Sequence, residues 1–417
     1  MHGNGFLKIL LLISTISLLL DWYVFNGLKT ISNDWVSKFW RNLVLWGYLI
    51  LFIGSTLFMI IVAKDFTTEN GMRPFHEWVL SIFLVFFITK IFFALVLLLG
   101  DLIRLIIGLF NKIAHSNNKP AIPARRKFAA QLAVIVSSIP FASFLYAMFK
   151  GKYDYKVHRT TLYFDDLPEA FNGFTITQLS DIHSGSFDHT AAVQRGIDLA
   201  KAQKSDLYVF TGDLVNNVAT EIDPYIDMFG SIKAPFGQYS ILGNHDYGDY
   251  IHWNSLAEKA ANLEKLKQQH AALGYRLLLD ENVTVEKDGQ KISLIGVQNW
   301  GRGFIQIGDL DKALIGVPPD AFKILLSHDP THWEEKVRYN DANIHLTLSG
   351  HTHGAQFGVE TSSFRWSPVQ YRYLDWAGLA NEKERYLYVN RGFGFLAFSG
   401  RLGIWPEITV IELRKRV

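Results

Sequence analysis

The chain has 417 residues, of which 49% are hydrophobic and 19% are charged, and it contains no cysteine. This composition excludes a disordered or fibrous protein, and it leaves no thiol for a disulfide, a cysteine-bound metal or a nucleophile. The net charge of +2 is unevenly distributed, because residues 1–150 hold 14 Lys and Arg against six Asp and Glu. The remainder is acidic, so no nucleic-acid partner is expected.

Four long apolar segments lie near the start of the chain, at residues 6–25, 43–62, 78–99 and 128–148. Each is close to the ~20 apolar residues that cross a hydrocarbon core of about 30 Å. We therefore expect an α-helical transmembrane region of about four helices over residues 1–150, followed by a second domain over residues 151–417. Lys90 interrupts the third segment, and we expect it to face other helices or to reach the interface.

Positive charges in the short loops predict the orientation of this region. They lie in the first and third loops, at Lys29, Lys38, Arg41, Arg104, Lys112, Lys119, Arg125, Arg126 and Lys127. Both loops are therefore expected in the cytoplasm, which predicts an integral protein of the bacterial inner or cell membrane with an extracytoplasmic second domain. The Arg125-Arg126 pair resembles a twin-arginine export signal, and a plain basic membrane flank is an equally good interpretation.

Short apolar runs alternate with turns and amphipathic stretches from residue 153 onwards. Buried strands are expected at residues 175–179, 207–210, 238–242, 292–297, 323–326, 344–348 and 387–389. Amphipathic helices are expected at residues 191–203 and 256–273. This alternation predicts an α/β domain with a large sheet core.

Five of these predicted strands are followed immediately by residues of types that can bind metals. They are Asp181 and His183, then Asp213, then Asn244, His245 and Asp246, then His328 and Asp329, and finally His351 and His353. Loops beyond strand ends are where α/β folds carry their sites. Carboxylate, imidazole and amide groups are ligands for Mn, Fe or Zn, and the absence of thiolates favours a hydrolytic site over a structural one.

The same residues resemble the five motifs of the calcineurin-like metallophosphoesterases, in that family's order. The motifs are Asp181-x-His183, Gly212-Asp213, Gly243-Asn244-His245-Asp246, His328 and Gly350-His351-x-His353. The resemblance spans roughly residues 174–411 and is strongest to the membrane-anchored branch that includes YkuE- and YaeI-like phosphodiesterases. It implies a four-layer α/β/β/α sandwich with two divalent transition-metal ions (Mn, Fe or Zn) at one edge.

The resemblance also implies how the metals are held. The first metal would take Asp181, His183 and His353, and Asp213 would bridge to the second. The second metal would be completed by Asn244, His328 and His351. A hydroxide that bridges the two metals would attack phosphorus.

Further roles follow for residues that hold no metal. By the resemblance, His245 would contact the phosphate or protonate the leaving oxygen, and Asp246 would orient its imidazole. The alternative for Asp246 is a helix cap. Asn216 has no assigned role. Arg391 and Arg401 lie in a glycine-rich segment after the motifs, and they are expected to contact a phosphate.

The function most favoured is hydrolysis of a phosphodiester or pyrophosphate by a membrane-anchored enzyme, with an envelope or lipid-linked substrate as a candidate. Aromatic and basic residues at positions 364–376 suit a bilayer interface, and they suit an ordinary loop equally. Two alternatives stay open. One is a UDP-2,3-diacylglucosamine pyrophosphatase-like activity in lipid A synthesis, whose substrate is cytoplasmic. The other is a non-catalytic receptor or scaffold that retains the fold.

Overall fold

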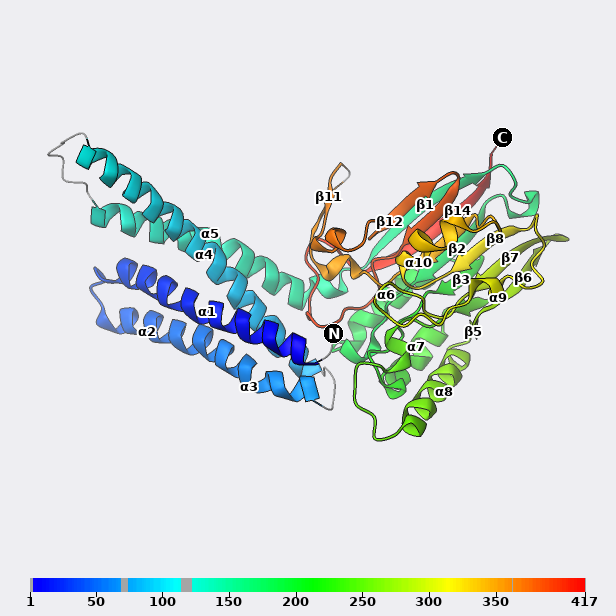
Figure 1. The fold of residues 1–417 in the computed structure, drawn as a ribbon, viewed down its shortest axis with the longest axis horizontal. Helices are drawn as coiled ribbons and strands as arrows, with labels where there is room; N and C mark the ends of the chain where they lie inside the picture. Colours follow the sequence, from blue (N-terminus) through cyan, green and yellow to red (C-terminus); the bar gives the residue numbers. More distant parts are fainter. Residues whose placement is uncertain (1–2, 69–73, 114–121, 362, 417) are drawn as a thin grey trace. The chain divides into compact units, whose positions relative to one another are not determined.

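Two compact units make up the chain, Met1–Phe149 and Lys150–Val417. The computed structural model describes residues 3–68, 74–113, 122–361 and 363–416 (Figure 1). Each unit has its own hydrophobic core. Lys119, one of the cations expected in the cytoplasm, lies outside the described residues.

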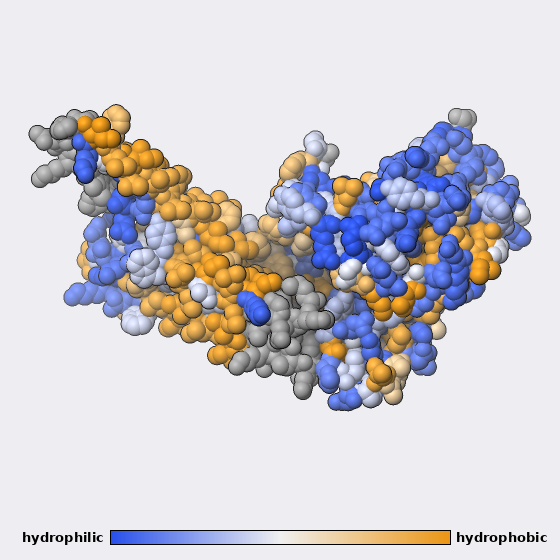
Figure 2. Space-filling view, viewed as in Figure 1, coloured by the Kyte–Doolittle hydropathy of each residue, from blue (hydrophilic) through white to orange (hydrophobic). Residues whose placement is uncertain are grey.

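Long apolar helices form unit 1. They are α1 (Gly3–Ser32), α2 (Lys38–Tyr48), α3 (Gly54–Thr68), α4 (Pro74–Ile113) and α5 (Ile122–Phe149), and a π-helical turn at Leu49–Ile53 joins α2 to α3. Four segments are long and apolar enough to cross a membrane, namely Leu11–Ser32, Lys38–Val62, Pro74–Ile113 and Arg126–Tyr153. The four predicted apolar helices are thus confirmed. Hydrophobic side chains cover much of the face of this unit that Figure 2 shows, as expected where lipid rather than water surrounds a helix.

Lys90 lies inside unit 1 and is paired. Its Nζ is 3.0 Å from Asp21 Oδ2 and donates to Ser17 Oγ at 2.5 Å. The Tyr48 hydroxyl donates to the other oxygen of Asp21 at 2.6 Å. A charge within a bilayer is costly unless it is paired, so Lys90 faces its neighbouring helices and ties α4 to α1.

Two six-stranded sheets form the framework of unit 2. The first has the order β1 (Lys156–Phe164), β14 (Glu407–Lys415), β2 (Phe174–Leu179), β3 (Leu207–Phe210), β4 (Gln238–Ser240) and β5 (Arg276–Leu277). The second has the order β12 (Gly378–Glu382), β13 (Arg385–Val389), β9 (Leu346–Ser349), β8 (Phe322–Leu326), β7 (Gln290–Gly296) and β6 (Glu281–Lys287). A small ribbon pairs β10 (Val359–Glu360) with β11 (Arg365–Trp366).

The central strands of each sheet are parallel. In the first sheet β2, β3 and β4 run the same way, and in the second β7, β8, β9 and β13 do so. Parallel strands are buried on both faces, which explains their continuous apolar runs. Their carboxyl ends lie at one edge of the sheet, so the loops that follow them gather there.

The core of unit 2 joins the two sheets to each other and to helices. Ile176 and Leu207 of the first sheet share one buried cluster with Ile292, Ile324 and Leu346 of the second. A second cluster joins the first sheet to α6 (Thr190–Lys201) and α8 (Leu256–Ala272), and a third joins the second sheet to α9 (Leu310–Ala313) and α10 (Pro330–Glu335). The predicted α/β domain is confirmed, and the four-layer order stays a prediction.

Candidate metal centre

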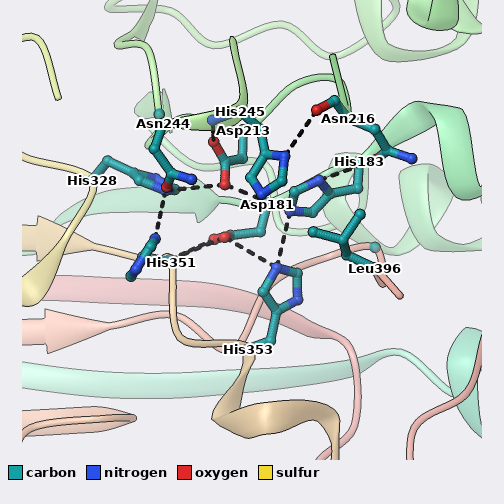
Figure 3. Close-up of polar contacts among 12 residues, drawn as sticks. Asp181, His183, Asp213, Asn216, Asn244, His245, His328, His351, His353 and Leu396 are labelled. Atoms are coloured by element: carbon teal, nitrogen blue, oxygen red, sulfur yellow. Dashed lines mark hydrogen bonds and ion pairs between the residues drawn. The ribbon is translucent and has the colours of Figure 1, made fainter. Parts of the chain in front are cut away.

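All seven predicted metal ligands meet at the carboxyl edge of the sheets (Figure 3). Asp181 and His183 follow β2, Asp213 follows β3, Asn244 follows β4, His328 follows β8, and His351 and His353 follow β9. The topology explains this convergence, because each loop leaves the carboxyl end of a parallel strand. Segments far apart in the sequence therefore build one site.

Asp181, His183 and His353 form one group of potential ligands, and all three are buried. The Nε2 atoms of His183 and His353 lie 3.0 Å apart, and His353 Nε2 lies 3.3 Å from Asp181 Oδ1. The three ligand atoms lie within 4.8 Å of one another. Buried polar groups gathered this closely need a shared partner, and a cation is the one that suits them all.

Asp213, His328 and His351 form the second group. His328 Nε2 lies 3.1 Å from Asp213 Oδ2 and 3.3 Å from His351 Nδ1. The side-chain oxygen of Asn244 lies 3.2 Å from the same His328 nitrogen and adds an amide oxygen to the potential metal ligands. Asp213 Oδ2 also lies 3.6 Å from His183 Nε2, so this one carboxylate contacts both groups.

The backbone at the site is left-handed at five of these residues. The φ angles are +51° at Asp181, +46° at His183, +61° at Asp213, +73° at His351 and +51° at His353. L-residues adopt this region rarely, and such residues cluster at functional sites where the surroundings hold them. Close packing adds a further constraint, because a Cβ at Gly350 would lie 2.2 Å from Asp181 Oδ2.

The electrostatics of the centre favour a cation. Burial acts to raise the pKa of Asp181, but His353 and His328 hold it below its usual range. Asp213 behaves in the same way, since the effect of burial on its pKa is outweighed by His328 and His245. Burial would lower the pKa of His328, yet Asp213 raises it to about 10. Two buried, ionised carboxylates thus favour a bound cation at the centre. The carboxylate, imidazole and amide groups around them are suited to bind two divalent metal ions.

The outer nitrogens of two imidazoles are fixed by oxygen atoms. His183 Nδ1 lies 3.2 Å from Asn216 Oδ1, and His328 Nδ1 lies 2.7 Å from the main-chain oxygen of Thr211. These oxygens accept hydrogen bonds, so each Nδ1 carries a proton and each Nε2 is the atom that would offer its lone pair to a metal in the centre. Partners of this kind set the tautomer and the ring direction of metal-binding histidines.

Two groups contact the Nε2 atom of His351. Its Nε2 lies 2.8 Å from the Tyr373 hydroxyl and 3.3 Å from Asp329 Oδ2. The other oxygen of Asp329 accepts from the main-chain N–H of Thr331 at 2.8 Å, as an N-cap of α10 does. Asp329 is therefore both a cap and a neighbour of His351.

His245 lies beside both groups, but Asp246 does not orient it. His245 Nδ1 lies 2.8 Å from the main-chain oxygen of Asn216, and that carbonyl fixes the ring. The buried carboxylate of Asp246 instead accepts hydrogen bonds from the main-chain N–H groups of Asp213 and Gly243, each at 2.9 Å. The predicted orienting role of Asp246 is thus wrong, because its side chain caps the loop that carries Asp213. Burial and Asp213 raise the pKa of Asp246 to about 7.

Arg391 and Arg401 are buried and engaged by protein groups, which argues against the predicted phosphate contact. Arg391 is buried, and its Nη1 lies 2.5 Å from Glu407 Oε2. Its other side pairs with Glu360. Arg401 is fully buried, and its Nη2 donates to His353 Nδ1 at 3.0 Å from behind the site. One guanidinium is neutralised by carboxylates and the other is enclosed by protein, so neither is available to a phosphate.

Several side chains that border the site were not predicted from the sequence. The ring of Tyr250 lies 4.3 Å from that of His245, centroid to centroid, and the ring of Phe304 meets the edge of His351 at 4.7 Å. The guanidinium of Arg372 lies 5.3 Å from the centre of the Phe304 ring. Arg372 is exposed and pairs with no carboxylate among the residues that the structure describes.

A membrane-spanning helical unit followed by an α/β unit with a buried Asp/His centre defines a membrane-bound metallohydrolase. Residues 174–355 match the family model described as calcineurin-like phosphoesterase, and residues 7–152 match one described as a probable calcineurin-like phosphoesterase transmembrane domain. The chain belongs to the calcineurin-like phosphoesterase family, as its motifs predicted. It is an integral membrane protein and a metal-dependent phosphoester hydrolase.

Three curated relatives illustrate this membership. The chain is 30% identical to the uncharacterized metallophosphoesterase YkuE of Bacillus subtilis, over 60% of this chain and 82% of that protein. It is 26% identical to the transmembrane protein with metallophosphoesterase domain of Danio rerio, over 90% and 80% of the two chains. It is also 26% identical to the phosphodiesterase YaeI of Escherichia coli, over 70% and 99%. The second match covers most of both units.

Proposed function

We propose that this protein hydrolyses a phosphodiester or pyrophosphate bond in a membrane-associated substrate. The two metals would be held by the seven residues Asp181, His183, Asp213, Asn244, His328, His351 and His353. The observation that carries the proposal is the position of Asp213, whose Oδ2 lies 3.1 Å from His328 and 3.6 Å from His183. A carboxylate that contacts both ligand groups is what a dinuclear centre requires. The phosphodiesterase name of the relative YaeI supports the choice of bond.

The residues around the centre would have different roles in the reaction. Bound Mn, Fe or Zn would supply the Lewis acidity that activates water and offsets charge on the phosphate. His245 keeps its Nδ1 proton on the Asn216 carbonyl, which leaves Nε2 to hold or donate a proton at the leaving oxygen. Arg372 would bind a phosphate oxygen from the open side, and Tyr250 and Phe304 would border the leaving group.

A lipid-linked substrate is supported by the surface beside Arg372. Tyr371 and Leu374 flank this region and are 80% and 76% exposed, and Phe364 is exposed as well. Aromatic and aliphatic side chains beside arginine suit the boundary between head groups and acyl chains. A water-soluble substrate would need none of these exposed apolar groups.

An extracytoplasmic position of unit 2 is also part of the proposal, and it rests on the cations of the first and third loops. In that orientation the substrate is an envelope phosphate, and cytoplasmic UDP-diacylglucosamine is excluded. A reporter fusion at the C-terminus tests this point. Alkaline phosphatase folds only outside the cytoplasm and should be active there. A bright cytoplasmic fluorescent protein at the same position would place the nucleotide-lipid substrate first.

The activity is tested on the purified full chain in detergent, stripped with a chelator and reloaded with Mn. Bis-p-nitrophenyl phosphate should be hydrolysed faster than p-nitrophenyl phosphate, and a phospholipid phosphodiester faster still. Asp213→Asn should abolish hydrolysis and lower the metal content measured by elemental analysis. A chain that binds two metals but prefers the monoester would contradict the choice of bond. A chain that binds none, with no activity on added Mn, would contradict the centre itself.

A further inference from the structure

A recess with a volume of about 500 Å³ opens on unit 1, and none of the residues that line it belongs to the metal centre. It lies between the last part of α4 and the first part of α5. Three cationic side chains line it, Arg104 and Lys112 from α4 and Arg126 from α5, together with the single carboxylate of Asp101. The function proposed above makes no use of these residues.

The recess has an excess of positive charge. Both oxygens of Asp101 are already engaged, because Oδ1 accepts from Arg104 Nη1 at 2.6 Å and Oδ2 accepts from the Tyr23 hydroxyl at 2.8 Å. Arg104 is thus balanced by one carboxylate, whereas Lys112 and Arg126 have no acidic partner in the lining. A net charge of about +2 in so small a space favours an anion.

The shape of the recess is set by Gly108. Arg104, Gly108 and Lys112 are spaced by four residues and lie on one face of α4. A Cβ at Gly108 would meet no atom within 4 Å, so the glycine leaves open space between the two cations. Arg104 Nε is buried and has no hydrogen-bond partner in the part of the chain that the structure describes.

The recess lies at the boundary of the bilayer. Between Glu77 and Asp101, Lys90 is the one charged residue, and at 1.5 Å per residue this part of α4 is about 35 Å long. That length matches a hydrocarbon core of about 30 Å, so Asp101 and Arg104 come where it ends. In α5, no charged residue follows Lys127 until Lys150, which places Arg126 at the same kind of boundary. Hydrophilic side chains also gather where α1 ends and α2 begins (Figure 2).

We propose that this recess binds the head group of an anionic membrane phospholipid. Its phosphodiester would contact Arg104, Lys112 and Arg126, its glycerol would lie beside Leu105 and Leu109, and its acyl chains would extend past Asp101 into the hydrocarbon core. These two leucines line the recess and are 59% and 52% exposed. A free phosphate ion would use the cations alone, whereas the position of the recess at the end of the hydrocarbon core, beside exposed leucines, favours a lipid. Basic pockets between membrane helices are a known means of holding such head groups.

The test uses the full chain in a mild detergent and counts bound lipids by native mass spectrometry. Phosphatidylglycerol should be retained in preference to phosphatidylcholine. Arg104→Gln should weaken this retention about fivefold, the factor expected for ~1 kcal/mol per cation near a membrane surface. Gly108→Leu should weaken it as well by filling the recess without any change of charge. If Arg104→Gln does not fold, Lys112→Gln takes its place.

Lys127→Gln is the matched control. Lys127 lies next to Arg126, but it pairs with Asp34 at 2.9 Å and does not line the recess. The variant should retain phosphatidylglycerol as the wild type does. Equal loss in Lys127→Gln and Arg104→Gln, or no effect of Gly108→Leu, would show unspecific surface charge and overturn the proposal. Displacement of the lipid by millimolar inorganic phosphate would show a free-ion site and overturn it too. Metal content and phosphodiester hydrolysis are measured in separate assays, so a failure of the lipid site is distinguishable from a failure of the proposed function.

Discussion

The imidazole of His245 is fixed by the main-chain carbonyl of Asn216, whose oxygen lies 2.8 Å from His245 Nδ1. The side chain of Asn216 does something different, since its Oδ1 lies 3.2 Å from Nδ1 of the candidate ligand His183. One residue thus orients a candidate catalytic group through its backbone and a candidate ligand through its side chain. A substitution at position 216 removes only the second contact, which makes the two roles separable.

Asn216→Ala should therefore weaken metal binding and leave the proton chemistry largely intact. Loss of a partner that orients a ligand lowers metal affinity by about 10–100-fold. Metal titration of the chelator-treated protein measures this change, and kcat at saturating Mn should stay near the wild-type value. Asn217→Ala is the neighbouring control and should bind metal normally. A large fall in kcat with unchanged affinity would show that Asn216 acts on catalysis instead.

His245→Gln should have the opposite pattern. The imidazole is placed for acid–base help, which is worth about 10²–10⁴ in rate, so kcat should fall by that factor. Metal content should stay at the wild-type value, because His245 is not one of the proposed ligands. The loss should be smaller for nitrophenyl esters, whose leaving group needs no proton. Equal losses for alkyl and nitrophenyl esters would indicate that His245 positions the phosphate.

Arg372→Gln should raise KM more than it lowers kcat. Hydrogen bonds to charged groups contribute about 1.5–3 kcal/mol, so kcat/KM should fall by roughly 10–100-fold. Arg302→Gln is the matched control, because Arg302 is also exposed near Phe304 but pairs with Glu334 and Glu335. Initial rates over a range of bis-p-nitrophenyl phosphate concentrations separate the two constants. Equal KM values in Arg372→Gln and the wild type would exclude a phosphate contact.

The ligand positions were predictable because the topology decides them. A buried strand is visible as a short apolar run, and a polar residue just after it must lie at the carboxyl edge of a parallel sheet. Asp213 after β3 and His328 after β8 are examples, although 115 positions separate them in the sequence. Strand β1 was not predictable in the same way, because its first six residues are exposed or half-buried and show no apolar run. Its partner β14 lies about 250 residues later in the sequence.

The supporting contacts were not predictable, for physical reasons that differ. The acceptor for His245 is a main-chain oxygen of Asn216, and a carbonyl leaves no trace in the sequence. Asp246 is adjacent to His245, yet its carboxylate turns to backbone N–H groups, which adjacency cannot reveal. Arg391 has the composition of a phosphate ligand, but Glu360 and Glu407 neutralise it from distant segments. In each case the partner is decided by folding rather than by local pattern.

His270 predicts a pH dependence of stability in unit 2. It is fully buried in α8, its Nδ1 lies 2.9 Å from Ser240 Oγ, and burial lowers its pKa from 6.5 to about 3. The unfolded chain binds a proton near pH 6.5 while the folded chain does not. The contribution of His270 to the free energy of unfolding is therefore fully present above pH 6.5. It declines as the pH falls toward 3, by up to about 1.4 kcal/mol per pH unit.

His270→Gln isolates this contribution, because glutamine can still bond Ser240 but does not titrate. Thermal unfolding of the full chain in detergent, followed between pH 7.5 and 4.5, gives the melting temperature of each protein. Acid also releases metals by protonating their ligands, and both proteins share that effect. The variant is expected to be less stable at pH 7.5 and to lose less on acidification, so the two curves converge. Parallel curves would show that His270 takes up its proton equally in the folded and unfolded chain.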